Sequence, residues 1–190
     1  MSDEISFFLV KTEVYKIGDS KPAVKFNVVV EPNSWSKIAK SRGVTDQKIS
    51  ETKINHINFW EGLKDYSSNT NTKLRITRTP RYQHWYDVSI GTSGVNISLT
   101  RNTREENVGS EIWIADSQSI FDKLLRNKEK VESIVGEQVH WHELETKKAS
   151  RVRCIYPCDP DDNNRHEEYY KWLTETSEKL IEAFYAVTKP

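Results

Sequence analysis

This sequence is poor in the residues that build disulfide scaffolds and membrane spans. Its 190 residues include two cysteines, one methionine, seven glycines and six prolines. Cys154 and Cys158 are too few for the disulfide framework of a small secreted domain. No apolar run approaches the roughly 20 residues that a membrane-spanning helix needs. Nothing before Ile5 has the charged and apolar regions of a signal peptide, so we expect a soluble, cytoplasmic protein with reduced thiols and no membrane partner.

The chain also lacks a net charge. Lysine and arginine together number 28, and aspartate and glutamate together also number 28. A polyanionic partner would therefore be recognised by local clusters of cations and not by overall charge. Hydrophobic residues make up only 36%, but six tryptophans, eight tyrosines and six phenylalanines supply bulky side chains. A chain of this length can thus bury a proper core.

The centre of the sequence, residues 84–114, predicts three consecutive antiparallel strands. Apolar and polar residues alternate in each of them, which is the pattern of a sheet with one buried face. Gly91 and Gly94 bound a four-residue turn between the first two strands, and a longer polar segment separates the second from the third. We expect Arg101 and Arg104 to lie in exposed loops of this meander.

Further elements are predicted on both sides of the meander. In chain order they are a hairpin of residues 7–17 and 24–30, a helix from 46 to about 66, a helix from 117 to 136, strands over 139–144 and 151–156, and a C-terminal helix that contains residues 169–184. Together they predict an α+β fold, with an antiparallel sheet of about five strands, helices packed on one face and an N-terminal β-hairpin. We divide the chain into residues 1–32 for the hairpin, 33–45 for a linker and 46–190 for the α+β domain.

Catalytic motifs in the sequence are weak. His140 and His142 lie on one face of a predicted strand, where both imidazoles could bind one metal if a third ligand converged. The alternative is two surface histidines beside a core Trp141. Residues 51–53 and 145–147, both Glu-Thr-Lys, match the acid-x-lysine part of a magnesium nuclease site, but neither follows a well-placed aspartate. We therefore expect no catalytic residues, no bound metal and no cofactor.

Cations gather in three segments that contain almost no acids. Arginine predominates in them, and its planar fork suits phosphate. If the segments are neighbours in one sheet, they form a positive surface for a nucleic-acid backbone. The alternative is a solvated sheet face whose cations pair with Glu105, Glu106 and Glu111. The three segments contain Lys73, Arg75, Arg78 and Arg81; Arg101 and Arg104; and Lys147, Lys148, Arg151 and Arg153.

The residues of the meander also form a recognisable pattern. It consists of HWYDVSIGTSGVNISLTRNTREENVGSEIWI over residues 84–114, with Phe59, Trp60 and Leu63 before it and KKASRV over residues 147–152 after it. This pattern resembles an uncharacterised bacterial and archaeal domain of unknown function that is found C-terminal to PD-(D/E)XK nuclease-like domains.

The resemblance covers about residues 55–186 and has implications for the rest of the chain. Residues 5–37 resemble the closing strands of the nuclease-like domain, which implies that residues 1–32 are the remnant of that domain. The chain would then be a C-terminal fragment or a truncated relative. The aspartate and Glu-x-Lys motif of the nuclease would be absent, and residues 46–190 would be an accessory domain.

These observations predict a nucleic-acid-binding or targeting accessory domain of a restriction- or defence-type nuclease-like protein, with DNA as the candidate partner and no active site of its own. One alternative is a protein-interaction or oligomerisation domain that docks a separate nuclease-like partner, or itself, through strand edges in residues 5–30. The other is a residual metal-dependent nuclease that uses His140, His142 and Glu145. The residues expected to contact nucleic acid are Arg101, Arg104, Lys148, Arg151 and Arg153, with Trp85 as either a stacking surface or a core residue.

Overall fold

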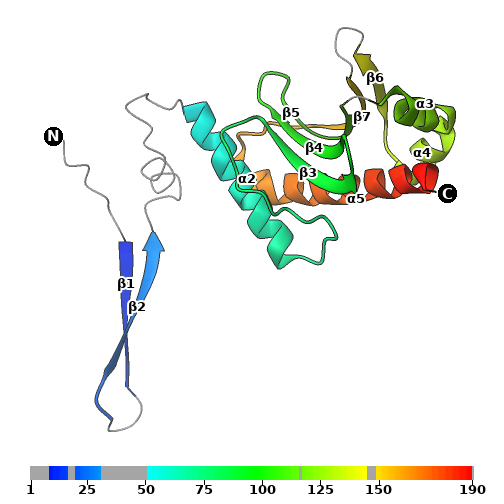
Figure 1. Cartoon of the computed structure of the whole chain (residues 1–190). Helices are drawn as coiled ribbons and strands as arrows, with labels where there is room; N and C mark the ends of the chain where they lie inside the picture. Colours follow the sequence, from blue (N-terminus) through cyan, green and yellow to red (C-terminus); the bar gives the residue numbers. More distant parts are fainter. Residues whose placement is uncertain (1–8, 17–19, 31–50, 116, 145–148, 190) are drawn as a thin grey trace. The chain divides into compact units, whose positions relative to one another are not determined.

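The structure is a computed structural model, and it describes residues 9–16, 20–30, 51–115, 117–144 and 149–189. The chain forms two compact units, Met1–Ile49 and Ser50–Pro190. In the first unit β1 (Leu9–Tyr15) pairs antiparallel with β2 (Ala23–Val30), as Figure 1 shows. This pairing confirms the predicted N-terminal hairpin. The linker predicted for residues 33–45 lies outside the described residues.

The second unit contains a five-stranded antiparallel sheet with the strand order β3-β4-β5-β7-β6. Its strands are β3 (Trp85–Thr92), β4 (Val95–Asn102), β5 (Asn107–Ile114), β6 (His140–Leu144) and β7 (Ala149–Pro157). The first three are neighbours in both sequence and space, which confirms the predicted meander. Gly91 and Gly94 form the β3–β4 turn with φ angles of 79° and 73°, a region that favours glycine because it has no Cβ atom.

The helices of the second unit pack against one face of the sheet. Figure 1 shows α5 running along the sheet, where it contacts β4 and β5. The ring of Trp60 in α2 lies 5.8 Å from that of Tyr86 in β3, and the ring of Phe121 in α3 lies 6.3 Å from that of Trp141 in β6. Within the described ranges, none of the helices combines the length and apolar character needed to cross a membrane. The helices are α2 (Glu51–Asn69), α3 (Gln118–Arg126), α4 (Lys128–Val135) and α5 (His166–Thr188), with a short 3-10 turn, η1 (Asn163–Arg165), before the last.

The prediction of one continuous helix from residue 117 to residue 136 is wrong, because the helix is broken at Asn127. This residue ends α3 and begins α4, with φ −109° and ψ 28°. Its side-chain amide donates to the carbonyl oxygen of Lys123 at 2.8 Å, a local bond through which asparagine competes with regular helix. Gly136 ends α4 in the left-handed region with φ 68°, as its position after the apolar stripe predicts.

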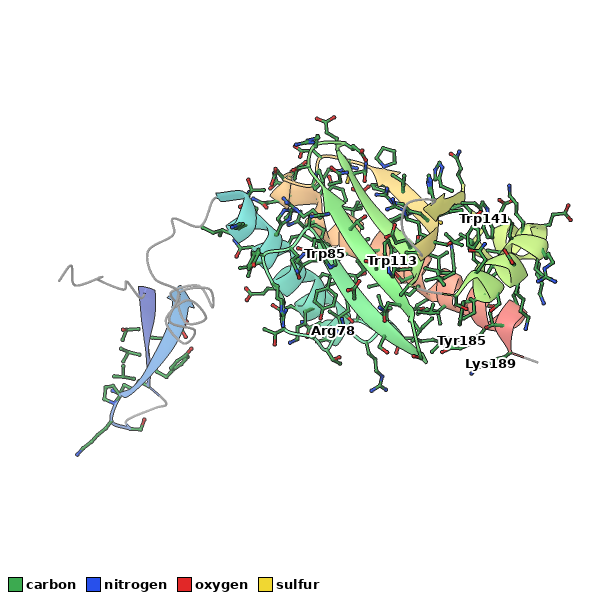
Figure 2. All side chains as sticks on the ribbon, turned by 45° about the horizontal axis from the view of Figure 1, so that its top comes forward. Arg78, Trp85, Trp113, Trp141, Tyr185 and Lys189 are labelled. Carbon is green, nitrogen blue, oxygen red and sulfur yellow. The ribbon has the colours of Figure 1, made fainter. Side chains whose placement is uncertain are left out.

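Side-chain alternation divides the sheet into an inner face and an open face. Val88, Ile97, Ile112 and Val152 pair across four strands, and all four are buried beneath the helices. The residues between them point to the other side, which no described helix covers. In Figure 2 the strands lie in front of α5, with Trp85 and Trp113 labelled on them. We call this side the open face, and its residues are Trp85, Asp87, Ser89, Asn96, Ser98, Thr100, Asn107, Gly109, Glu111, Trp113, His140, His142, Arg151, Arg153 and Ile155.

Candidate functional site

Three of the six residues predicted to contact nucleic acid lie together on the open face. They are Trp85 at the start of β3 and Arg151 and Arg153 on β7, which confirms that the two arginines face away from the apolar positions of their strand. Arg104 is exposed in the turn between β4 and β5, as expected. Lys148 lies outside the described residues. The sixth residue, Arg101, lies on the inner face.

Arg101 is not in an exposed loop, and that expectation is wrong. It lies in β4, and its side chain is 1% exposed. Its Nη1 lies 3.1 Å from Nδ1 of His56, and its Nη2 donates to the carbonyl oxygen of Pro160 at 3.0 Å and to the carboxylate of Asp161. The guanidinium carbon also lies 5.4 Å from the ring centroid of Phe59. These contacts join α2, β4 and the segment before α5, so the guanidinium is occupied inside the protein.

Two histidines beside Arg101 favour the neutral form. Burial and the Arg101 charge lower the pKa of His56 from 6.5 to about 4. Burial also lowers the pKa of His166, whose Nε2 donates to the carbonyl oxygen of Pro160 at 3.1 Å and whose Nδ1 accepts from the hydroxyl of Tyr170 at 3.3 Å. Sequence reasoning missed this cluster, because the partners of Arg101 come from segments 45 to 60 residues away along the chain.

A carboxylate between two arginines occupies the centre of the open face. Glu111 is 3% exposed, and its Oε2 lies 3.6 Å from Nη1 of Arg151 and 3.7 Å from Nε of Arg153. Arg153 is its direct partner on the neighbouring strand. Burial raises the pKa of Glu111, while the charges of the two arginines oppose that rise. The pairing with acids that the sequence offered as an alternative is therefore found at Glu111, although this residue is buried and not solvated.

The guanidinium of Arg153 lies over Gly109, where no side chain occupies the space beneath it. A Cβ atom at Gly109 would be 3.1 Å from Nε of Arg153 and 2.6 Å from Oγ1 of Thr100. Nη2 of Arg153 donates to Oγ1 of Thr100 at 3.3 Å and to Oδ1 of Asn107 at 3.4 Å. The side chain is consequently held across β5 toward β4 and is 13% exposed. Arg151 is freer, with a side chain 30% exposed.

One cation of the segment that contains Lys73, Arg75, Arg78 and Arg81 lies at the edge of the open face, namely Arg78. This residue lies in the segment between α2 and β3, and its Nη1 is 3.9 Å from Oδ2 of Asp87 on β3. Its carbonyl oxygen accepts a hydrogen bond from the hydroxyl of Tyr86 at 2.5 Å. Because Arg78 has an acidic partner, its charge is partly neutralised at that edge.

Two tryptophans also belong to the open face. Trp85 is 38% exposed, and its ring lies 4.8 Å from that of His84 in an edge-to-face arrangement. This exposure argues against the core alternative for Trp85. Trp113 is partly exposed on β5. Sequence reasoning missed Trp113 as a surface residue, although its alternation with the apolar Ile112 and Ile114 is the signal that identifies its face.

A stacked pair of histidines completes the open face. The rings of His140 and His142 have centroids 6.4 Å apart and an interplanar angle of 20°, and the two residues pair with Arg153 and Arg151. Burial, followed by the charge of Arg151, lowers the pKa of His142. Among the residues that the structure describes, no group of three or more His, Cys, Asp or Glu side chains is arranged to hold a metal ion. Glu145 lies outside those residues.

Comparison with known proteins identifies a family. Residues 56–188 match the model of a family described as a domain of unknown function, DUF4268. This match covers most of the chain, so the chain belongs to that family. No curated protein and no solved structure matches it.

Proposed function

We propose that the second unit binds nucleic acid through the open face of its sheet. Arg151 and Arg153 contact phosphates, Trp85 offers an aromatic surface to a base, and Arg104 extends the contact from the β4–β5 turn. Lys148, which directly precedes β7 in the sequence, belongs to the same set. The observation that supports this proposal is the strand register, which gathers guanidinium and aromatic groups on the face without helices.

The arrangement of the two arginines suits exchange of a carboxylate for a phosphate. Both anions accept from the guanidinium fork, so a phosphate can take the place of Glu111 as the partner of Arg151. Burial raises the pKa of Glu111, so burial and the loss of its arginine contacts act in the same direction and favour its neutral form. Arg153 is held by Thr100 and Asn107, so little side-chain freedom remains to be lost when a ligand binds.

We further propose that this domain serves as the targeting module of a restriction- or defence-type nuclease-like protein and has no active site of its own. The resemblance of residues 84–114 to domains that follow PD-(D/E)XK nuclease-like domains supports this role. In this proposal cleavage belongs to the nuclease-like protein, and the open face brings it to DNA.

Fluorescence anisotropy with labelled DNA at about 50 and 200 mM salt tests the proposal. We expect binding that weakens with salt and that falls at least tenfold in the double variant Arg151→Ala with Arg153→Ala. The matched control is Arg126→Ala with Lys171→Ala, which removes two exposed cations from α3 and α5. The proposal fails if DNA does not bind, if binding is independent of salt, or if both double variants lose affinity equally.

A second candidate function, protein interaction, is favoured by the surface of the hairpin. Val14 and Val24 are paired across β1 and β2 and are 63% and 53% exposed, and Tyr15 is 53% exposed. A two-stranded hairpin is marginally stable alone, so contact with a second copy or with a nuclease-like partner would cover these side chains. Sedimentation velocity checks self-association, which Val14→Ser with Val24→Ser should reduce. A monomer at all concentrations contradicts self-association through the hairpin.

A further inference from the structure

We infer that the open face binds single-stranded nucleic acid and discriminates against duplex. This inference rests on the proposed function and narrows its ligand to strands whose bases are unpaired and free to stack. It is carried by the spacing of the two tryptophans on the open face and by the balance of charges around them.

Trp85 and Trp113 are too far apart for one base to contact both. Trp85 pairs with Thr100, and Thr100 pairs with Gly109, which lies four residues before Trp113 on β5. Neighbouring strands are about 4.8 Å apart and the rise is about 3.4 Å per residue, so the two tryptophan Cα atoms are roughly 17 Å apart. Two bases of one strand, separated by other nucleotides, can therefore stack one on each ring.

Stacking on these rings requires bases that are not in a duplex. Inside a duplex each base is covered on both faces by its neighbours, and a protein reaches those faces only after the base is flipped out. Unpaired bases expose both faces and stack on aromatic side chains without regard to sequence. Beside Trp113 lies its strand partner Asn96 of β4, which is partly exposed and whose amide group suits the polar edges of unpaired bases.

The charges of the open face are too balanced for tight duplex binding. Its described residues include two arginines, Arg151 and Arg153, and two carboxylates, Asp87 and Glu111. Affinity for duplex DNA comes largely from cations that neutralise phosphates and release counterions, and it grows with the number of such contacts. Two arginines with acidic neighbours provide few of them. Stacking must then supply most of the affinity, and single strands alone offer it.

Anisotropy titrations of the full chain with one labelled oligonucleotide, as a single strand and annealed to its complement, test this inference. We expect the single strand to bind at least tenfold more tightly than the duplex. Phosphate contacts from Arg151 and Arg153 alone give a log–log salt slope of magnitude about 1.4 for the single strand, and further contacts from Arg104 and Lys148 bring it to at most about 2.8. Inorganic polyphosphate, which has phosphates but no bases, should compete poorly with the single strand.

Variants of the open face test the stacking itself. Trp85→Leu and Trp113→Leu should each weaken single-strand binding about fivefold or more. The control Tyr82→Leu removes a ring that is 55% exposed outside the strands, and it should change affinity by less than about twofold. Circular dichroism verifies folding. Since Trp85 is exposed, we expect Trp85→Leu to fold, and this variant tests the stacking even if Trp113→Leu does not fold.

The outcomes separate this inference from the proposed function. Duplex binding that is equal or tighter, with a steep salt dependence, overturns the inference and leaves the proposed function standing. Failure of both forms of DNA to bind overturns both. Equal competition by polyphosphate, tryptophan variants that bind as the wild type does, or tighter binding of a polyglutamate peptide also overturns the inference, because the face would then select charge and not bases.

Discussion

Replacing Arg101 with lysine keeps the buried positive charge of β4 but removes the planar fork of the guanidinium. That fork lies 3.1 Å from Nδ1 of His56 and donates to the carbonyl oxygen of Pro160 at 3.0 Å and to the carboxylate of Asp161. We expect one ammonium group on a flexible stem to reach only one of the three, so two partners lose a charge-assisted hydrogen bond. At about 1.5 kcal/mol for each, the free energy of unfolding should fall by about 3 kcal/mol.

Urea unfolding followed by tryptophan fluorescence measures this change. Trp60 of α2 is a suitable reporter, because it is fully buried and its indole N–H donates to the carbonyl oxygen of Gln83 at 2.8 Å. The control Arg104→Lys alters an exposed turn residue and should change stability by less than about 0.5 kcal/mol. A loss below about 1 kcal/mol in Arg101→Lys, or an equal loss in the control, would refute the structural role assigned to the fork.

Three further predictions concern stability and binding. Because the pKa of His56 is lowered from 6.5 to about 4 by burial and the Arg101 charge, the unfolded chain binds more protons between these values. Stability should therefore fall by about 3 kcal/mol as the pH drops from 6.5 to 4, and urea unfolding of His56→Gln should show a flatter dependence. Gly109→Ala places a Cβ atom 2.6 Å from Oγ1 of Thr100. We expect it to cost about 1–3 kcal/mol, and an unchanged melting temperature in calorimetry would contradict this. Glu111→Gln removes the anion that competes with phosphate for both arginines, so DNA should bind several-fold more tightly at pH 7; anisotropy that shows equal or weaker binding would count against the exchange.

Local patterns were sufficient to predict the sheet and part of its open face. Alternation of apolar residues with a glycine-bounded turn predicts the meander, because a strand with one buried face has a period of two and a short turn forces antiparallel pairing. The same period places Arg151 and Arg153 opposite the buried Val152, and the strand register confirms this. The break between α3 and α4 at Asn127 could not be predicted from a local pattern, since neither proline nor glycine lies at this position.

The position of Arg101 shows where sequence reasoning fails. Arg101 lies two residues after Leu99, so the period of two points it to the inner face, but its charge favours an exposed loop. Whether Arg101 lies on the inner face or in an exposed loop depends on whether buried hydrogen-bond partners exist for its guanidinium. Here the partners of Arg101 are His56 and Asp161, which come from distant parts of the chain. No local sequence pattern predicts that these three residues lie together.

The dependence of the sheet on α2 determines how this domain can be transplanted. α2 contributes Phe59, Trp60 and Leu63, each 0% exposed, and it also carries His56 to Arg101. A fragment that starts after α2 would leave a large apolar surface of the remaining domain in water and a buried cation short of a partner. In fusion proteins or domain swaps the junction therefore belongs ahead of α2, near Ser50, where the second compact unit begins.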